Sequence, residues 1–250
     1  VLEIASNLAV KIGISPDLGQ EIFVGGSYVL AGIILIFIRA KENLNNPHEA
    51  PHILEDLKDG LSYLKGNGKV RNAIIQLIIL FSIFAALSVL AVRLAAILPI
   101  IRAEQFGFLM ASSGLGMALG ATILGNFGEK FPQTKFSLFG SLGVAVCLFC
   151  LGIFTQSLWF SLSLTIIMGI CGAFIAVPMQ TTIQSETPDQ MRGKVFGLQN
   201  NVINIALSLP LALAGVAETV FGLRNVFISL SIIAISGGLL TWYYKVSPEI

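Results

Sequence analysis

The sequence predicts an all-α membrane protein, and its composition carries that prediction. Only 12% of its 250 residues are charged, whereas a soluble domain contains about 25%. Hydrophobic residues make up 55%, enough for about seven bilayer-spanning helices of ~20 residues each. A net charge of +1 gives no support for a nucleic-acid partner, which would need clustered basic residues. The expected surroundings of most of the chain are therefore a lipid bilayer.

The apolar runs are predicted to be helices, because backbone groups in lipid must bond within their own segment and no run alternates with the period of barrel strands. The predicted spans are residues 21–39, 73–101, 106–126, 136–155, 158–178, 196–216 and 223–244.

Basic residues gather on one side of these spans. Of the 15 Lys and Arg residues, eleven fall in the loops and tail of one side, and four fall elsewhere. Cytoplasmic loops hold the excess of basic residues in membrane proteins. We therefore expect a multi-pass protein of the cell membrane with a cytoplasmic C-terminus.

Residues 40–72 form the longest polar connection and are predicted to be a cytoplasmic linker between two bundles. Because the chain has no initiator Met, residues 1–39 are expected to be the remnant of an N-terminal bundle, including one complete transmembrane helix. Residues 73–250 are expected to form a C-terminal six-helix transmembrane bundle.

The middle of this linker is predicted to be an amphipathic helix. Its apolar residues recur at helical spacing and are Ile53, Leu54, Leu57, Leu61 and Leu64. This apolar stripe could lie along the membrane face or the underside of the bundle, or the helix could simply pack on protein.

Residues 125–132 resemble a loop signature of the major facilitator superfamily, Gly-x-Leu-x-Asp-Arg-x-Gly. Gly125 is kept, Glu129 and Lys130 are conservative replacements, and Pro132 departs from the signature. Glu129 could cap or pair across helix ends, and Lys130 could hold the cytoplasmic interface. A solvated turn is the alternative.

The segment 178–195, which contains Arg192, is similar to the loop before the penultimate helix in bacterial drug, macrolide and siderophore exporters of this superfamily. Gly125, Glu129, Lys130 and Arg192 are therefore the gating-loop candidates. The resemblance implies a major facilitator-type helical bundle. The chain would supply the last helix of the N-terminal half and the whole six-helix C-terminal half.

The resemblance further implies a secondary active transporter that exports a small amphipathic molecule by alternating access of two bundles. Its partners would be the lipid bilayer, the small-molecule substrate and the missing N-terminal half of the same protein. The alternative is a non-transporting or split membrane half that needs a partner chain.

Polar residues inside spans are costly and often mark a substrate pathway. Asn200, Asn204 and Ser208 fall on one face of the predicted helix 196–216, which makes this helix the first candidate to line a central cavity. Hydrogen bonding between helices is the alternative. Gln180, near the internal mouth, is a further cavity candidate, or simply a loop residue.

Arg93 is the only charge placed well within a predicted span. With a helix end near Ile101, it would lie ~12 Å from that end. A cavity-facing Arg93 could attract a carboxylate-bearing substrate or pair with a carboxylate of the N-terminal half. Snorkelling or a structural ion pair is the alternative.

Two predicted helices have a face of small residues at four-residue steps, and such faces let helices pack closely in lipid. The residues are Ser112, Gly116 and Gly120 in one helix and Thr165, Gly169 and Ala173 in the other. Each face could form a rocking interface between bundles or serve static packing.

Nothing in the sequence indicates catalysis, so we predict that the protein is not an enzyme and needs no cofactor. No Asp or Glu lies centrally in a predicted span, and residues 66–69 lack the spacing and hydroxyl of a phosphate-binding loop. Pro51 separates His48 from His52, which argues against a metal site.

Overall fold

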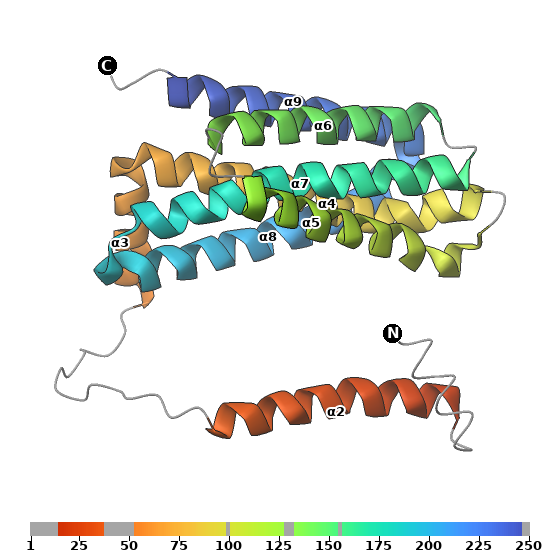
Figure 1. The fold of residues 1–250 in the computed structure, drawn as a ribbon, viewed down its shortest axis with the longest axis horizontal. Coiled ribbons are helices and arrows are strands. Elements are labelled where there is room, and N and C mark those ends of the chain that lie inside the picture. Colours follow the sequence, from red (N-terminus) through yellow and green to blue (C-terminus); the bar gives the residue numbers. More distant parts are fainter. Residues whose placement is uncertain (1–14, 38–52, 99–100, 128–132, 155–156, 247–250) are drawn as a thin grey trace. The chain divides into compact units, whose positions relative to one another are not determined.

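The computed structural model describes residues 15–37, 53–98, 101–127, 133–154 and 157–246. This part of the chain is helical apart from short turns, which confirms the predicted all-α class (Figure 1). The chain divides into two units, Val1–Pro51 and His52–Ile250, and each is described by itself.

The first unit contributes one described helix, α2 (Pro16–Phe37). Its apolar side chains are largely exposed, with Ile36 and Phe37 each at 81%. Burying such side chains is strongly favourable, so α2 needs lipid or protein around it. Residues 38 and 39 of the predicted first span lie outside the described part of the chain.

The second unit contains the short helix α3 and six helices that are long and apolar enough to cross a membrane, within the described residues. The bounds are α3 (Ile53–Gly66), α4 (Gly68–Ile97), α5 (Gly107–Phe127), α6 (Gln133–Ile153), α7 (Leu158–Glu186), α8 (Asp189–Phe221) and α9 (Leu223–Val246), with a 3-10 turn, η1 (Ala103–Gln105), before α5.

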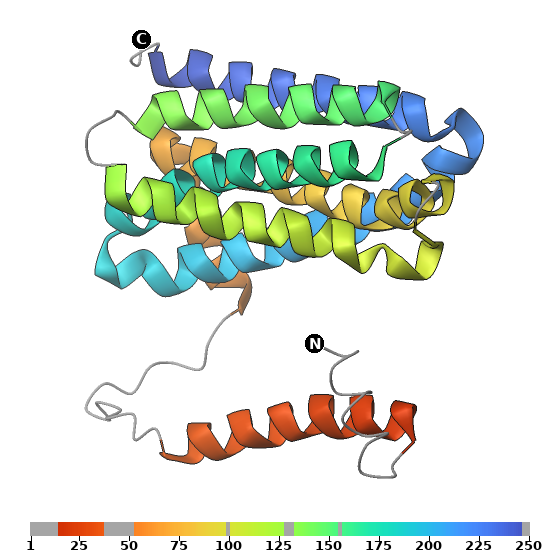
Figure 2. The ribbon, with the colours of Figure 1, turned by 45° about the vertical axis from the view of Figure 1, so that its right-hand side comes forward.

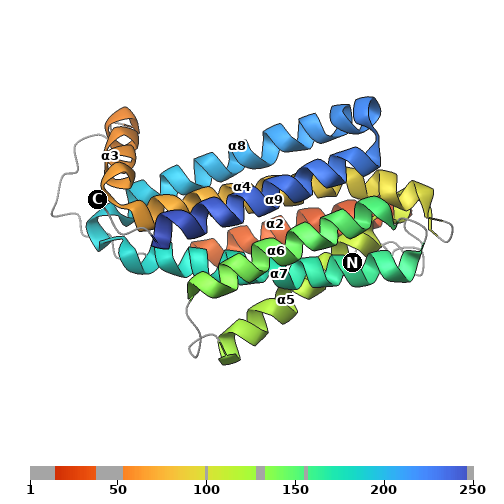
Figure 3. The same ribbon diagram turned by 90° about the horizontal axis from the view of Figure 1, so that it is seen from above.

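The six long helices form one bundle (Figures 1 and 2). Helix α7 packs between α5 and α6, α6 also packs on α9, and α4 contacts α7, α8 and α9. Helix α3 crosses one end of the bundle, at a steep angle to the long helices (Figure 3). We call this the α3 end, and the end that carries η1 and Gly222 the distal end.

The predicted boundaries between α7 and α8 were wrong. The sequence indicated spans that end at residue 178 and resume at 196, but α7 continues to Glu186 and α8 begins at Asp189. The 33 residues of α8 extend about 50 Å, beyond the ~30 Å hydrocarbon layer. Hydropathy marks only the apolar part of a helix, so the polar ends were assigned to a loop.

The proline at the predicted end of α7 does not end that helix. Pro178 lies inside α7, and the Thr182 hydroxyl donates a hydrogen bond of 2.8 Å to the Pro178 carbonyl. Proline has no backbone N–H, so the carbonyl that loses its helical partner is that of Phe174, four residues earlier, and transmembrane helices tolerate such an interruption. The Thr182 bond is a separate contact from a side chain to the backbone one turn further on.

Helix α4 is shifted relative to its predicted span of 73–101. It begins at Gly68, because the Asn67 side chain accepts a hydrogen bond of 3.1 Å from the Val70 amide and caps the helix. It ends at Ile97, followed by Leu98 in an extended conformation (ψ 133°). The residue before a proline disfavours helical dihedrals, and residue 99 is a proline.

The two predicted small-residue faces pack against each other, between α5 and α7. A β-carbon at Gly116 would collide with the Ile166 carbonyl oxygen, and one at Gly169 would collide with the Ser113 carbonyl oxygen. The hydroxyl oxygens of Ser112 and Thr165 lie 2.5 Å apart across the same seam. Both faces therefore serve close packing within this bundle.

Candidate functional site

The candidate site is a face of the bundle formed by α4 and α8. Asn200, Asn204 and Ser208 are exposed and follow one another at four-residue steps along α8. The Ser208 hydroxyl donates to the Asn204 carbonyl at 2.8 Å. Within the described residues, the side-chain amides of Asn200 and Asn204 have no hydrogen-bond partner. These amides are therefore available to a ligand, to water or to another helix.

Helix α8 is the least enclosed of the long helices. Only 11% of its most apolar window is buried, against 56% for α4. Beside the polar stripe, α8 exposes large apolar side chains such as Ile205, Leu209 and Val216. This face therefore presents amide groups flanked by hydrocarbon, a surface suited to an amphipathic molecule.

An open groove of about 330 Å³ lies between α4 and α8. Ser208 lines it together with Phe84, Ser88 and Leu211. The Ser82 hydroxyl donates to the Ala206 carbonyl at 3.2 Å and joins the two helices next to the groove. Sequence reasoning missed the α4 side because apolar residues occur on every face of α4, so no periodic pattern distinguishes its groove-facing residues.

Arg93 and Glu218 form an ion pair at the distal end of the α4–α8 seam. Arg93 Nε lies 3.0 Å from Glu218 Oε1, and the two side chains are 61% and 17% exposed. Because α4 ends at Ile97 and not near Ile101, Arg93 is four residues, about 6 Å, from the helix end. The structure thus corresponds to the ion-pair alternative, with the carboxylate supplied by this chain.

Gln180 is not a loop residue, because α7 extends past it. Its side-chain oxygen accepts a hydrogen bond of 2.8 Å from the amide of Gln199 on α8. Gln199 is only 8% exposed and was missed by sequence reasoning, although it directly precedes the Asn200 stripe. The pair joins α7 to α8 near the α3 end, so Gln180 has a contact within the bundle.

The structure describes two of the four gating-loop candidates, Gly125 and Arg192. Gly125 is exposed near the end of α5, and Arg192 forms an ion pair of 2.8 Å with Asp189 in the first turn of α8. This pair is local and joins no other helix. Glu129 and Lys130 lie outside the described residues, so their roles stay predictions.

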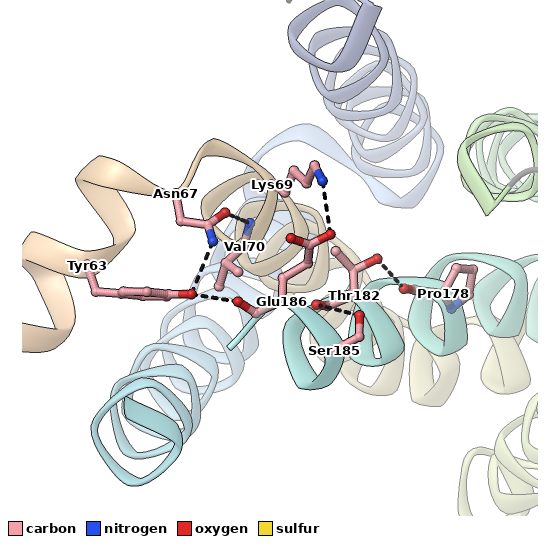
Figure 4. A network of polar contacts seen from close by, with 8 residues as sticks. All are labelled: Tyr63, Asn67, Lys69, Val70, Pro178, Thr182, Ser185 and Glu186. Carbon is pink, nitrogen blue, oxygen red and sulfur yellow. Dashed lines mark hydrogen bonds and ion pairs between the residues drawn. The ribbon is translucent and has the colours of Figure 1, made fainter. Parts of the chain in front are cut away.

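Other residues join the helices at the α3 end (Figure 4). The Tyr63 hydroxyl donates to the Glu186 carbonyl at 2.7 Å, and the Asn67 amide donates to the Tyr63 hydroxyl at 3.1 Å. Lys69 Nζ lies 3.0 Å from Glu186 Oε1. These contacts connect α3 and α4 with the end of α7.

Helix α3 is also held on α8. Lys194 Nζ lies 3.0 Å from Asp56 Oδ1 and 2.6 Å from Asp59 Oδ2, and Gly60 is buried beside the Lys194 carbonyl. The predicted apolar stripe contributes only in part to the packing, because Leu57 and Leu61 stay 38% and 47% exposed, whereas Leu64 packs against the core. The acidic residues at 56 and 59 were the sequence signal for this contact.

The described residues contain no group of three or more His, Cys, Asp or Glu side chains that could hold a metal ion. What the bundle offers instead is an amphipathic face with a groove, on helices long enough to cross a bilayer. Fold and site together define a multi-pass α-helical membrane protein with a candidate small-molecule path.

The family is shown by comparison with known proteins. The sequence model of the Major Facilitator Superfamily matches residues 73–250. The chain therefore belongs to this superfamily. The chain is 26% identical over 238 residues to the uncharacterized MFS-type transporter YfiS of Bacillus subtilis, covering 90% of this chain and 55% of the relative. It is 30% identical over 128 residues to a staphyloferrin B transporter of Staphylococcus aureus, covering 51% of this chain and 30% of the relative.

The chain thus spans about half (55%) of the length of the B. subtilis relative. The predicted resemblance to this superfamily is confirmed. Transport is the general activity of the superfamily. Substrate, direction and partners belong to the proposal below.

Proposed function

We propose that this chain is part of a secondary active transporter that exports a small amphipathic molecule by alternating access. The single observation that carries the proposal is the exposed Asn200, Asn204 and Ser208 stripe beside the α4–α8 groove. Amide groups facing hydrocarbon would be costly, so a polar stripe on a membrane helix favours a wet, protein-lined path over a lipid-facing surface.

The groove suits one wall of a binding site. Its volume, about 330 Å³, lies at the lower end of the roughly 300–1,000 Å³ usual for small-molecule pockets. We propose that the other wall belongs to an N-terminal half of the same protein. Residues 1–39 would then end that half, 40–72 would link the halves, and 73–250 would form the second half.

The charge distribution supports a proposed orientation in the membrane. Among the described residues, most of the basic side chains belong to the α3 end, so we infer that this end and the C-terminus face the cytoplasm of a bacterial-type cell. Export of an amphipathic compound is suggested by the exporter-like segment 178–195. The similarity to the staphyloferrin B transporter of S. aureus makes staphyloferrin B a trial substrate.

The test uses the complete gene that contains this chain, expressed in cells that lack efflux activity of their own. Asn204→Ala removes one amide of the stripe, and Ser236→Ala removes a hydroxyl that bonds only to its own helix on the exposed face of α9. Loss of one substrate hydrogen bond of about 1 kcal/mol lowers transport roughly fivefold.

We expect slower efflux of ethidium or staphyloferrin B in Asn204→Ala and normal efflux in Ser236→Ala, at matched membrane levels. Equal efflux in both variants would remove the stripe from the proposed path. No transport of any compound by the complete wild-type protein would contradict the transporter itself.

A second candidate is a membrane half that assembles with a separate chain, which the 55% coverage of the B. subtilis relative also permits. Expression of residues 1–250 alone and together with the upstream-encoded half separates the two. Activity that needs both polypeptides from separate genes supports the split form, whereas one continuous reading frame supports the single transporter.

A further inference from the structure

A second, much smaller cavity lies away from the α4–α8 face, between α4, α6, α7 and α9. Its volume is about 10 Å³, and apolar residues such as Ile83 and Val144 form most of its wall. Two polar side chains line it, Gln76 of α4 and Ser141 of α6. The cavity therefore has two polar side chains in an otherwise apolar wall.

Gln76 is only 3% exposed, and it lines this cavity. Its amide nitrogen donates a long hydrogen bond of 3.4 Å to Ser141 Oγ, while its side-chain oxygen, Oε1, has no partner within the described residues. Ser141 Oγ donates to the Ser137 carbonyl at 3.0 Å, so only its lone pairs face Gln76. That requirement turns the amide nitrogen toward Ser141 and leaves Oε1 unpaired.

An unpaired amide oxygen inside a membrane bundle is expensive, because neither lipid nor the apolar lining can donate to it. Buried polar groups of this kind are usually paired by ordered water when the space holds one molecule. A water needs roughly 10–15 Å³ and two to four polar partners. The cavity meets the lower bound and excludes anything as large as an organic substrate.

We propose that this cavity is a binding site for one structural water molecule. The water donates one hydrogen to Gln76 Oε1 and the other to the remaining lone pair of Ser141 Oγ. It thereby completes the hydrogen bonding of both side chains and joins α4 to α6 where α9 covers them. Hard divalent cations take six or more oxygen ligands, and two side-chain oxygens do not supply such a shell.

The direct test is a structure of the complete wild-type protein at a resolution that shows ordered water. We expect one density peak about 2.7–2.8 Å from Gln76 Oε1 and within hydrogen-bond distance of Ser141 Oγ. An empty cavity, a protein donor on Oε1, or a peak surrounded by a cation's set of oxygens would each overturn the proposal.

A second readout is hydroxyl-radical labelling, because bound water yields radicals that modify the side chains beside it. Ile83 lines the cavity and is 2% exposed, whereas Leu87, one turn further along α4, is 1% exposed and does not line it. We expect labelling of Ile83 but not Leu87 in the wild type, and loss of the Ile83 signal in Gln76→Leu.

The substitution Gln76→Leu removes the unpaired oxygen and keeps a similar volume, so the fold should survive. Unlabelled Ile83 in the wild type, or an unchanged signal in Gln76→Leu, would contradict the water site. The wild-type comparison of Ile83 with Leu87 holds even if the variant fails to fold. Neither experiment depends on transport.

Discussion

At the residue scale, Gly116 shows how closely α5 and α7 approach. Its α-carbon lies against the Ile166 carbonyl, so Gly116→Ala must push the two helices apart. Overpacking of this kind costs about 1–3 kcal/mol. We expect Gly116→Ala to lower the thermal unfolding midpoint of the purified protein in detergent. Gly114→Ala is the matched control, because no atom of another helix lies within 4 Å of the added carbon there. Equal midpoints for both variants would contradict the seam.

The ion pair of Arg93 and Glu218 allows a test of whether Arg93 serves structure or substrate binding. Arg93 is 61% exposed although Glu218 is only 17% exposed, so we expect a modest stability coupling of about 1 kcal/mol in a double-mutant cycle of Arg93→Gln and Glu218→Gln, measured by denaturation at low salt. If the pair only holds α4 to α8, both single variants should slow transport alike.

A contact between Arg93 and an anionic substrate would give a different result. Arg93→Gln would then reduce transport of a carboxylate-bearing compound far more than Glu218→Gln, and the double variant would not recover activity. The comparison therefore separates the two interpretations of Arg93 that the sequence left open.

At the element scale, the attachment of α3 to α8 depends on Lys194, which contacts both Asp56 and Asp59. We expect Lys194→Gln to loosen α3 and to raise the rate of tryptic cleavage at Lys58 and Lys65 severalfold, because proteolysis follows local unfolding. The difference should narrow at high salt, since exposed ion pairs are screened.

Arg192→Gln provides the control for this experiment. Like Lys194→Gln, it removes one basic residue and one tryptic site from the first turns of α8. The only ion pair that it breaks is the local pair with Asp189. Cleavage within α3 should therefore stay at the wild-type rate. Equal acceleration in both variants would show that general charge, and not the Lys194 contacts, holds α3.

Helix number and approximate position were predictable for these elements, but helix ends were not. Apolar runs in the sequence correspond to α4 through α9 because lipid demands both hydrophobicity and internal hydrogen bonding. The ends of α7 and α8 are polar, since α7 continues to Glu186 and α8 begins at Asp189. Hydropathy does not distinguish a polar helix end from a loop, so a helical extension looked like a loop.

At the scale of the whole molecule, α8 should place its two ends on opposite sides of the membrane. The test starts from a variant in which Ala replaces the native cysteines Cys147, Cys150 and Cys171. A single exposed cysteine is then introduced, either Gln190→Cys in the first turn of α8 or Asn225→Cys just beyond its last residue. We expect a membrane-impermeant maleimide added to intact cells to label Asn225→Cys only, and inside-out vesicles to give the reverse. Labelling of both from one side would contradict the membrane crossing and with it the transporter proposal.

The sequence by itself determined the class of the protein, because the count of charges, the lengths of the apolar runs and the side on which Lys and Arg gather are properties of the chain alone. It also placed Asn200, Asn204 and Ser208 on one helix face, since that follows from helical periodicity. Only the tertiary structure decided which faces meet: that Gly116 lies against α7, that Arg93 pairs with Glu218, and that Gln180 bonds Gln199. The physical reason is that packing partners are chosen by the shape and polarity of surfaces from distant parts of the chain, which a reading of local spacing does not contain.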